Sequence, residues 1–407
     1  MDTSAAAVRA PSPATVPVGS EIGRLRRVLV HRPGEELTRL TPSNFAQFLY
    51  DDVPWAERAA QEHDAFVATL AAHGVHVEYL TDALAIALQD DVVRAATITA
   101  AVDASLLAGH CRELLLEHLQ AVEPAALPQT LVAGVAFAEL PLDSWLRSFL
   151  AGTEFALAPL PNQTFVRDPS AWVYDQLCLT EMTKPARRRE AGHARLAQQV
   201  LTGSPEVFDR VFVSTRVEGG DLLVLGSGHV VIGVSERSST AGALAAAENF
   251  MQRHPDHRVI ITQLPVARWA MHLDTVLTMV DHDTFLAYPG LVQKLHGYQL
   301  SVQAGKAVCT GSGPLLDMFA EALGVPRVRL LGSSGDPFQD ERDQWNDAYN
   351  VLTLEPGRVV SYERNHRTND QLVRAGIDVV PFSGSELGRG RGGPRCMSCP
   401  LLRDATG

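Results

Sequence analysis

The segment VEGGDLLVLGSGHVVIGVSE (217–236) contains the structural unit from which this chain is built. Two apolar runs flank Gly226-Ser227-Gly228, and this pattern predicts a β-hairpin with a tight turn. The pattern recurs in SAWVYDQLCLTEM (170–182), TVLTMVDHDTFLAYPG (275–290) and NVLTLEPGRVVSYER (350–364). Each predicted hairpin is followed by a helical stretch and then by a short strand. These strands are expected at RVFVST (210–215), RVIITQL (258–264), VRLLG (328–332) and IDVVPF (377–382).

An aspartate lies at the mouth of each predicted hairpin. The four are Asp168, Asp221, Asp274 and Asp347, in the stretches FVRDP, VEGGD, MHLD and QWNDAYN. The first two intervals between them are 53 residues each, and the third is 73. A recurring period indicates repeated supersecondary units, and repeats that close into a ring place equivalent positions around one axis. With the β–α–β pattern over 22–80 as the first unit, the sequence predicts an α/β ring of five ββαβ units.

Composition and periodicity divide the chain into four regions. Residues 1–20 are rich in Ala, Pro and Ser, which is typical of a loose, disordered tail. Residues 21–81 form the first unit. Ala and Leu dominate 82–158, where we expect an inserted helical domain of four or five short helices. Residues 159–407 contain the remaining units and a C-terminal loop. Independent domains are the alternative, but linker-like composition is missing between the units.

Charge and composition exclude several classes of protein. Of the 407 residues 46% are hydrophobic, so the chain can bury a large core. Lys and Arg number 35 against 47 Asp and Glu, and this net charge of −12 argues against a nucleic-acid partner and a polybasic membrane anchor. Neither a membrane span nor a secretory signal is indicated, so a cytoplasmic location is expected. The five scattered cysteines are expected to be free thiols.

Several acids and one histidine would meet at the centre of such a ring. Asp168, Glu218, Asp221 and Asp274 would form an anionic pocket. That pocket suits a metal ion or an organic cation, and a guanidinium can donate paired hydrogen bonds to a carboxylate. Turn chemistry explains any one of these acids equally well, but their regular spacing favours a site. His272, two residues before Asp274, is a natural proton carrier near neutral pH. A metal-ligand role would gain from a second histidine at an equivalent position, and none is present.

The C-terminal stretch SELGRGRGGPRCMSCP (385–400) places four glycines and three arginines ahead of Cys396. A glycine-rich backbone allows close approach to a ligand, and nearby cations favour a thiolate, so Cys396 is a candidate nucleophile. The alternatives are a Cys-x-x-Cys redox pair, half of a zinc site, an RNA-binding tail and a flexible tail end. A redox pair usually opens a helix, a zinc site needs a second pair, and an RNA-binding tail needs more basic sequence.

In this order, FVRDP, EGGD, MHLDTV, QWND and ELGRGRGGPRCMSCP resemble the motifs of the arginine deiminases. That family belongs to the guanidino-group-modifying superfamily, whose fold is the pseudo-five-fold α/β propeller, or pentein. The resemblance covers about residues 21–403, including the helical-bundle insertion. It implies hydrolysis of free L-arginine to L-citrulline and ammonia, the first step of arginine catabolism, without a metal or organic cofactor. A homo-oligomer, either a dimer or a tetramer, is the expected assembly.

The resemblance also implies roles for individual residues. Cys396 matches the nucleophile of the family. Asp168 and Asp274 match the acids that hold the guanidinium, and Glu218 and His272 match its acid–base pair. The substrate-binding residues that it implies are Asn162, Phe165, Arg187, Arg237, Arg391 and, as part of a lid in TPSNFAQFLYDDVPW, Leu49. The neighbouring Arg188 and Arg189 are alternatives to Arg187.

Two other functions remain open from the sequence. A hydrolase or amidinotransferase for another guanidino compound, such as agmatine or methylarginine, would share most of these motifs. Arg237 and Arg391 argue against agmatine, which has no carboxylate for them to bind. A metal-binding or arginine-sensing protein without catalysis would have no need of Cys396. The sequence leaves open whether this thiol ionises before or after the substrate binds, because acids and cations both surround it.

Overall fold

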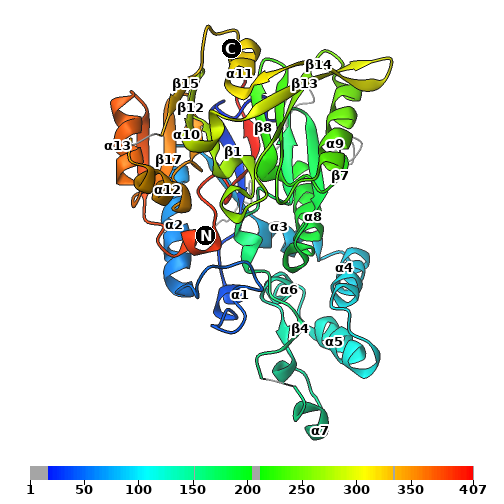
Figure 1. Cartoon of the computed structure of the whole chain (residues 1–407). Coiled ribbons are helices and arrows are strands. Elements are labelled where there is room, and N and C mark those ends of the chain that lie inside the picture. The colour runs from blue at the N-terminus through cyan, green and yellow to red at the C-terminus, as the bar shows by residue number, and fades with distance from the viewer. Residues whose placement is uncertain (1–16, 151, 204–210, 333–334, 407) are drawn as a thin grey trace, which may run out of the picture.

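A computed structural model of the chain describes residues 17–150, 152–203, 211–332 and 335–406. Five small sheets stand around a common centre, with helices on their outer sides (Figure 1). In four of the units an antiparallel hairpin is followed by a helix and by a third strand that runs parallel to the second. The first unit has the same strand order, but one of its strands comes from the C-terminal end of the chain. The predicted α/β ring of ββαβ units is therefore confirmed.

Four units follow one another along the chain. The second unit consists of β5 (Ser170–Val173), β6 (Gln176–Glu181), α8 (Glu190–Thr202) and β7 (Val211–Thr215). The third consists of β8 (Leu222–Gly226), β9 (His229–Val234), α9 (Thr240–Arg253) and β10 (Arg258–Gln263). The fourth consists of β11 (Leu277–Met279), β12 (Thr284–Ala287), α11 (Leu315–Leu323) and β15 (Arg329–Leu331). The fifth consists of β16 (Leu352–Glu355), β17 (Arg358–Tyr362), α13 (His366–Arg374) and β18 (Asp378–Phe382). All four predicted hairpins and their following strands are present, although Arg210 lies outside the described residues.

The turn of the third hairpin shows why the sequence folds locally in this way. Gly226, Ser227 and Gly228 have φ angles of 96°, 49° and 76°. Glycine enters this region at no steric cost, so the two glycines allow the chain to reverse within three residues. α9 then buries Ala243 and Phe250 in one core with the apolar side chains of β8, β9 and β10.

The first unit takes one of its strands from the far end of the chain. β1 (Leu25–Val30) pairs in parallel with β2 (His76–Tyr79) and antiparallel with β19 (Cys399–Arg403), and α2 (Ala56–Ala72) lies between β1 and β2 in sequence. The sequence pattern predicts β1, α2 and β2 but not β19, because a short strand that contains proline shows no clear alternation. Since β19 begins three residues after Cys396, the closure of the ring also anchors the loop that carries the candidate nucleophile.

An additional hairpin extends the third sheet. Its strands are β13 (His296–Gln303) and β14 (Lys306–Pro314), and the order of the sheet is β14-β13-β10-β9-β8. This hairpin accounts for the longer third interval between the repeated aspartates. The sequence does not predict it, because every side chain of β14 is exposed or half-exposed and no apolar alternation results.

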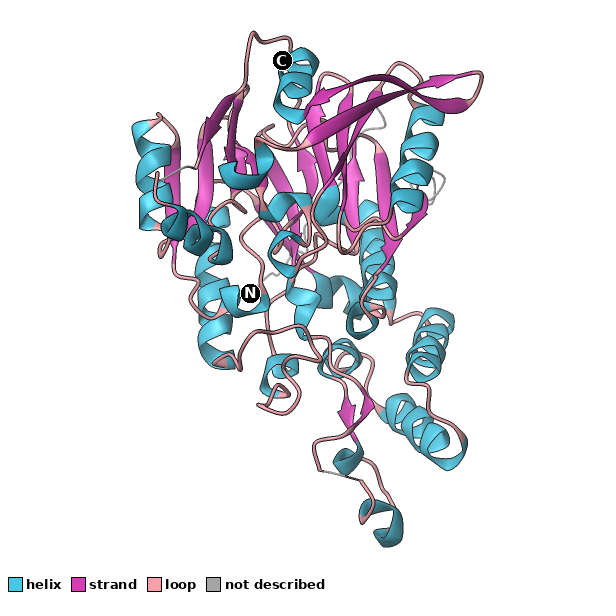
Figure 2. Ribbon diagram, viewed as in Figure 1, coloured by secondary structure: helices cyan, strands magenta, loops and turns pink. Residues whose placement is uncertain are grey.

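The segment between the first and second units is mainly helical and lies beside the ring (Figure 2). Its helices are α3 (Leu80–Ala87), α4 (Asp91–Ala104), α5 (Gly109–Ala121), α6 (Leu127–Ala133) and α7 (Ser144–Arg147). The segment also contains a short antiparallel pair of strands, β3 (Val135–Ala136) and β4 (Phe155–Leu157). The segment has a core of its own, to which Val102, Leu115 and Leu131 contribute. α3 instead packs Leu80 and Leu84 against the second unit, and this contact docks the insertion on the ring.

The predicted N-terminal tail needs a correction at its end. Residues 1–16 lie outside the described residues. Val18, assigned to the same tail, belongs to the fold: it exchanges two backbone hydrogen bonds with Tyr174, of 3.2 and 2.9 Å, and its side chain is 2% exposed. The turn of the β5–β6 hairpin offers unpaired backbone groups and apolar surface to this segment, which therefore becomes ordered.

The remaining short helices are α1 (Glu35–Thr38), α10 (Pro289–Val292) and α12 (Pro337–Trp345). In the described ranges, every helix is too short or too polar to cross a membrane. All five cysteines are unpaired, as expected for free thiols.

Candidate active site

The repeat brings the chemically interesting residues together. Asp168 lies just before β5, Glu218 before β8, His272 before β11, and Cys396 before β19. These are equivalent positions, each ahead of the first strand of a hairpin or of its counterpart in the first unit. In a ring such positions point to the same centre. Asp168, Glu218 and His272 lie together there, with donor atoms within 4.8 Å of one another.

A buried pocket lies at this centre. Its lining residues are Leu49, Asn162, Phe165, Asp168, Arg187, Arg237, Arg268, Met271, His272, Gly390, Arg391 and Cys396. All of the predicted site residues except Glu218 and Asp274 are in this set, and those two contact members of it, His272 and Cys396. Arg268, Met271 and Gly390 were not predicted. Met271 and Gly390 adjoin predicted residues, but nothing in the sequence marks Arg268.

Cys396 is buried, with 3% of its surface exposed. Its backbone N–H donates to Asn350 Oδ1 at 3.1 Å, and its Sγ lies 3.6 Å from Asp274 Oδ2. Burial, together with the negative charges of Asp274, Asp168 and Asp347, raises the pKa of the Cys396 thiol well above its usual value. In the free protein the thiol is therefore neutral near pH 7.

The glycines before Cys396 leave room for the neighbouring residues Phe165 and Asn350. A Cβ at Gly392 would lie 2.3 Å from a Phe165 ring carbon, and one at Gly390 would lie 2.8 Å from the same ring. A Cβ at Gly393 would lie 2.3 Å from the backbone oxygen of Asn350. The glycine-rich backbone thus permits close packing around Phe165, which lines the pocket.

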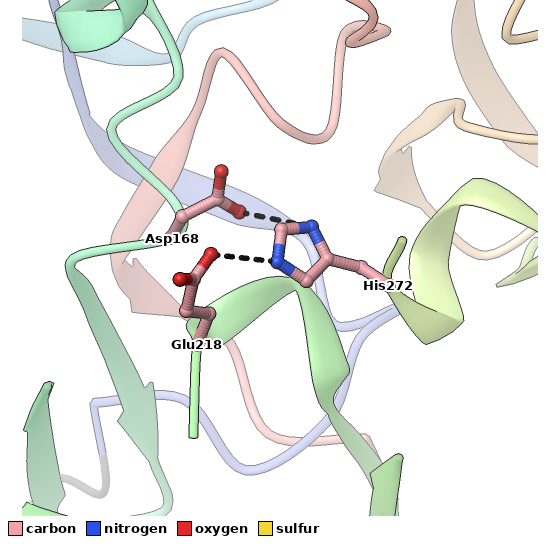
Figure 3. A group of neighbouring side chains, drawn as sticks. All are labelled: Asp168, Glu218 and His272. Atoms are coloured by element: carbon pink, nitrogen blue, oxygen red, sulfur yellow. Dashed lines mark hydrogen bonds and ion pairs between the residues drawn. The ribbon is translucent and has the colours of Figure 1, made fainter. Parts of the chain in front are cut away.

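His272 lies between two carboxylates (Figure 3). Its Nε2 is 2.9 Å from Glu218 Oε2, and its Nδ1 is 3.6 Å from Asp168 Oδ1. Burial alone would lower the pKa of His272. The charges of Asp168, Glu218 and Asp221 outweigh burial and raise the pKa of His272 to about 9. The imidazole is therefore protonated at neutral pH. The backbone N–H of Thr183 donates to the other oxygen of Glu218 at 2.9 Å and fixes its orientation.

Asp274 is held by an arginine that the sequence analysis assigned only as a nearby cation. Arg395 donates to Asp274 Oδ2 at 2.7 Å, and to both carboxylate oxygens of Glu21 at 2.9 and 3.1 Å. Burial opposes the charge of Glu21, but Arg395 and Arg167 lower the pKa of Glu21 to about 2. No local motif relates Glu21 to Arg395, since 374 positions separate them.

Asp168 is held in a similar way by Arg187. Arg187 Nη1 donates to Asp168 Oδ2 at 2.6 Å, and its other nitrogens donate to Glu190, Asn162 O and Phe165 O. The donors of Arg187 are thus already engaged. Burial opposes ionisation of Asp168, but His272 and Arg187 lower the pKa of its carboxyl.

Two other arginines of the pocket have unused donors. In the described part of the chain, Nε and Nη1 of Arg237 and Nε and Nη2 of Arg391 are buried and have no hydrogen-bond partner. Three of these nitrogens lie 3.7 to 3.9 Å from a carboxylate, of Glu236, Glu218 or Asp51, which is beyond hydrogen-bond distance. The guanidinium of Arg391 lies 3.9 Å from the ring centroid of Trp345. Buried donors without a partner are costly, so these groups are suited to an anionic ligand.

The remaining predicted residues shape the wall. Asn162 donates from Nδ2 to Phe48 O at 2.7 Å. Leu49 is half-buried and has a φ of 66°, and its backbone oxygen accepts from Arg268 Nη2 at 2.6 Å. Arg268 also donates to Asp51 at 2.9 Å. Arg268 therefore holds the predicted lid stretch over the pocket.

The other two repeated aspartates differ from the pocket acids. Asp221 accepts hydrogen bonds from Ser238, Ser235 and the N–H of Leu273, and burial raises its pKa to about 6. It therefore fixes the backbone beside His272. Asp347 is buried with a φ of 55°, and burial also raises its pKa to about 6. Neither side chain lines the pocket.

Asp168, Glu218 and His272 offer donor atoms within 4.8 Å of one another, which is close enough to bind one metal ion. The two ring nitrogens of His272 already face Asp168 and Glu218, and this arrangement also stabilises an imidazolium between two carboxylates. Chemically, the pocket combines a thiol, a protonated imidazole, two fixed carboxylates and two arginines with free donors. This combination suits covalent chemistry on a cationic group of a molecule that also carries an anion.

Comparisons with known proteins agree with the motifs. The family model described as arginine deiminase matches residues 46–403. An arginine deiminase of Rhodococcus erythropolis is 42% identical over 401 residues, which cover 96% of this chain and 98% of the relative. An arginine deiminase of Mycobacterium tuberculosis is 41% identical over 394 residues, which cover 95% of this chain and 98% of the relative.

Solved structures with the same fold are more distant in sequence. A mutant of DDAH from Pseudomonas aeruginosa, complexed with citrulline, has a TM-score of 0.54 and 17% identity, over 92% of this chain and 99% of that one. The N-terminal domain of ArgZ, covalently bound to a reaction intermediate, has a TM-score of 0.51 and 12% identity, over 93% and 98% of the two chains. These similarities show the fold, which is the predicted pentein.

Proposed function

The chain belongs to the arginine deiminase family, and from this premise we propose that it hydrolyses free L-arginine to L-citrulline and ammonia through a covalent intermediate on Cys396. The observation that carries the proposal is the position of Cys396 in one pocket with His272 and Asp168. A nucleophile, a proton carrier and a carboxylate for a cation are the groups that this reaction requires.

Two carboxylate oxygens are available for the guanidinium of the substrate. Asp168 Oδ1 and Asp274 Oδ1 are buried and have no hydrogen-bond partner within the described residues. The other oxygen of each is held by an arginine, Arg187 or Arg395, and this fixes the direction of the free one. We assign these two oxygens to the N–H groups of the guanidinium, which they hold flat and protonated beside the sulfur.

The thiol ionises, on this proposal, when the substrate binds. Burial and three negative carboxylates keep the Cys396 thiol neutral in the free protein. A guanidinium bound to Asp168 and Asp274 neutralises part of that field and adds a positive charge beside the sulfur, so it lowers the thiol pKa. The thiol loses its proton to solvent, and the thiolate then attacks the guanidinium carbon and forms a tetrahedral adduct.

His272 moves the protons. As the imidazolium it donates a proton to the departing nitrogen, the C–N bond breaks, and ammonia leaves a thiouronium on Cys396. The neutral imidazole then takes a proton from water, whose oxygen attacks the same carbon. The C–S bond breaks, the hydroxyl proton of the adduct passes to the sulfur of Cys396, and neutral citrulline leaves. Glu218 orients the imidazole and stabilises its charge in the first step.

The amino-acid end of the substrate meets Arg237 and Arg391, whose free donors suit its carboxylate. Arg187, which the sequence placed at this end, instead serves to hold Asp168, because its donors are engaged. Asn162, Phe165 and Leu49 form the wall and the lid. This arrangement favours free arginine over agmatine, which lacks the carboxylate, and over arginine within a peptide.

The test is the release of ammonia and citrulline from free L-arginine by the purified, chelator-treated protein, beside Cys396→Ala. Turnover by the parent and none by the variant supports a thiol mechanism that needs no metal. Agmatine, methylarginine and peptidyl-arginine are assayed in parallel. A higher kcat/KM for one of them than for arginine would show that this compound, and not arginine, is the preferred substrate. Turnover by Cys396→Ala would show that Cys396 is not the nucleophile.

We also place the reaction in the cytoplasm, where five unpaired cysteines remain reduced. The protein is proposed to act as a homo-oligomer. Fractionation of the native cells and sedimentation of the purified chain test the two proposals.

A further inference from the structure

An apolar groove lies between α4 and α8, where the insertion meets the second unit. Val92, Ala96 and Ala100 of α4 form one wall, and Leu196 of α8 contributes to the other. The groove has a volume of about 580 Å³, and 78% of the surface of Val92 is exposed. A hollow lined mainly by apolar side chains is suited to hold an aromatic side chain of a partner.

Two arginines lie on the α8 side of this groove. Arg188 and Arg195 line it with exposed side chains. Among the residues that the structure describes, neither has an ion-pair partner, whereas Arg189 donates to the backbone oxygen of Leu131. The groove is therefore an apolar surface with an uncompensated positive edge.

A second exposed apolar feature lies at the tip of the insertion. α7 lies at the lower end of the molecule, beyond β4 (Figure 1). There Trp145 and Phe149 form an edge-to-face pair with centroids 6.3 Å apart, although 62% and 78% of their surfaces are exposed. We call this feature the aromatic tip, composed of residues 143–150 and 152–154.

The aromatic tip carries charges opposite to those of the groove. Asp143 directly precedes α7, and Glu154 lies on the returning segment. Both are exposed, and within the described ranges neither forms an ion pair. Arg147 is the one basic residue between them, so the net charge of 143–150 with Glu154 is negative.

We propose that the aromatic tip of one copy of this chain docks in the α4–α8 groove of a second copy. Both features are apolar, and the unpaired acids of the tip complement the unpaired Arg188 and Arg195. In Figure 1 the tip lies at the far end of the insertion from α8, so it is presented outward and not to its own groove. Reciprocal exchange of two tips gives a closed two-fold dimer in which every contact occurs twice. This inference does not depend on the proposed reaction, since none of these residues lines the active-site pocket.

The first test measures the dimer dissociation constant by sedimentation velocity, for the full-length parent and for Trp145→Ala/Phe149→Ala. Buried aromatic side chains dominate such interfaces, and each occurs twice, so we expect dissociation to become about 100-fold easier or more. Phe338→Ala is the matched control, because Phe338 is 81% exposed on α12, and it should leave the constant unchanged. A monomeric parent, or a dimer equally stable in the double variant, would overturn the proposal.

The second test uses charge reversal. One variant carries Arg188→Glu/Arg195→Glu, and the other carries Asp143→Arg/Glu154→Arg. Each alone places like charges across both contacts and should weaken the dimer about 10-fold or more. In an equimolar mixture both contacts regain opposite charges, so heterodimers should form as strongly as the parent dimer. A mixture that stays monomeric would rule out this pairing. Circular dichroism and arginine turnover verify that each variant is folded.

Discussion

Replacement of Glu218 by Gln gives the sharpest test of the proposed proton carrier. Glu218 accepts two hydrogen bonds, from the Thr183 N–H and from His272 Nε2, each at 2.9 Å. A glutamine side chain is nearly isosteric but has one acceptor oxygen and one NH₂ group. It can accept from only one of the two donors, and its NH₂ group must face the other. The Glu218→Gln variant therefore loses the negative charge beside His272, and the imidazolium form of His272 becomes less stable.

The size of the effect follows from the geometry. With charge centres about 4 Å apart and an effective dielectric constant of about 20, the pair is worth at most about 4 kcal/mol, or about three pKa units. Asp168 and Asp221 remain beside the imidazole and retain part of the shift. Since one opposite charge typically shifts a pKa by about one to three units, we expect the pKa of His272 to fall from about 9 to about 7.

The assay is kcat/KM for arginine as a function of pH between pH 5.5 and 10. Because the reaction needs the imidazolium, activity falls as pH rises through the pKa of His272. The alkaline limb should therefore lie near pH 9 in the parent and about two units lower in Glu218→Gln. Glu236→Gln removes the same charge near the site without contacting His272, and its limb should stay near pH 9. A parent-like alkaline limb in a folded Glu218→Gln variant would show that His272 is not the acid or that Glu218 does not sustain its charge.

Three further variants test the packing of the site. Gly392→Ala places a Cβ 2.3 Å from the Phe165 ring. Steady-state kinetics should show a KM for arginine about 10-fold higher, and urea denaturation should show a free energy of unfolding lower by about 1–3 kcal/mol. Gly313→Ala is the control, because a Cβ there meets open space, and it should change neither quantity. Arg187→Ala leaves the buried Glu190 without its cation and Asp168 with His272 alone, and it should lower the free energy of unfolding in urea by about 3–5 kcal/mol; a loss below about 1 kcal/mol would contradict the buried network. Cys399→Ser should keep most of the turnover, because that thiol lies outside the pocket, and complete inactivation would contradict this.

The sequence alone determines the repeating unit and the position of the chemistry within it. Hairpins follow from apolar alternation and turn glycines, and these are properties of neighbouring residues. Because equivalent positions in a closed ring share one axis, the period also predicts that Asp168, Glu218 and His272 meet. Cys396 is recognisable from its glycine- and arginine-rich context. The sequence signal fails where a segment has no pattern of its own, as in β14, whose side chains are all at least partly exposed.

The tertiary structure decides what pairs across long separations and in which charge state each group exists. Glu21 and Arg395 lie 374 positions apart, yet together with Asp274 they form one buried network. β19 closes the ring by pairing with β1, a partner at the other end of the chain. The neutral thiol of Cys396 and the raised pKa of His272 depend on burial and on charges from several units. Such fields sum over distances in space, and the order of residues along the chain does not specify those distances.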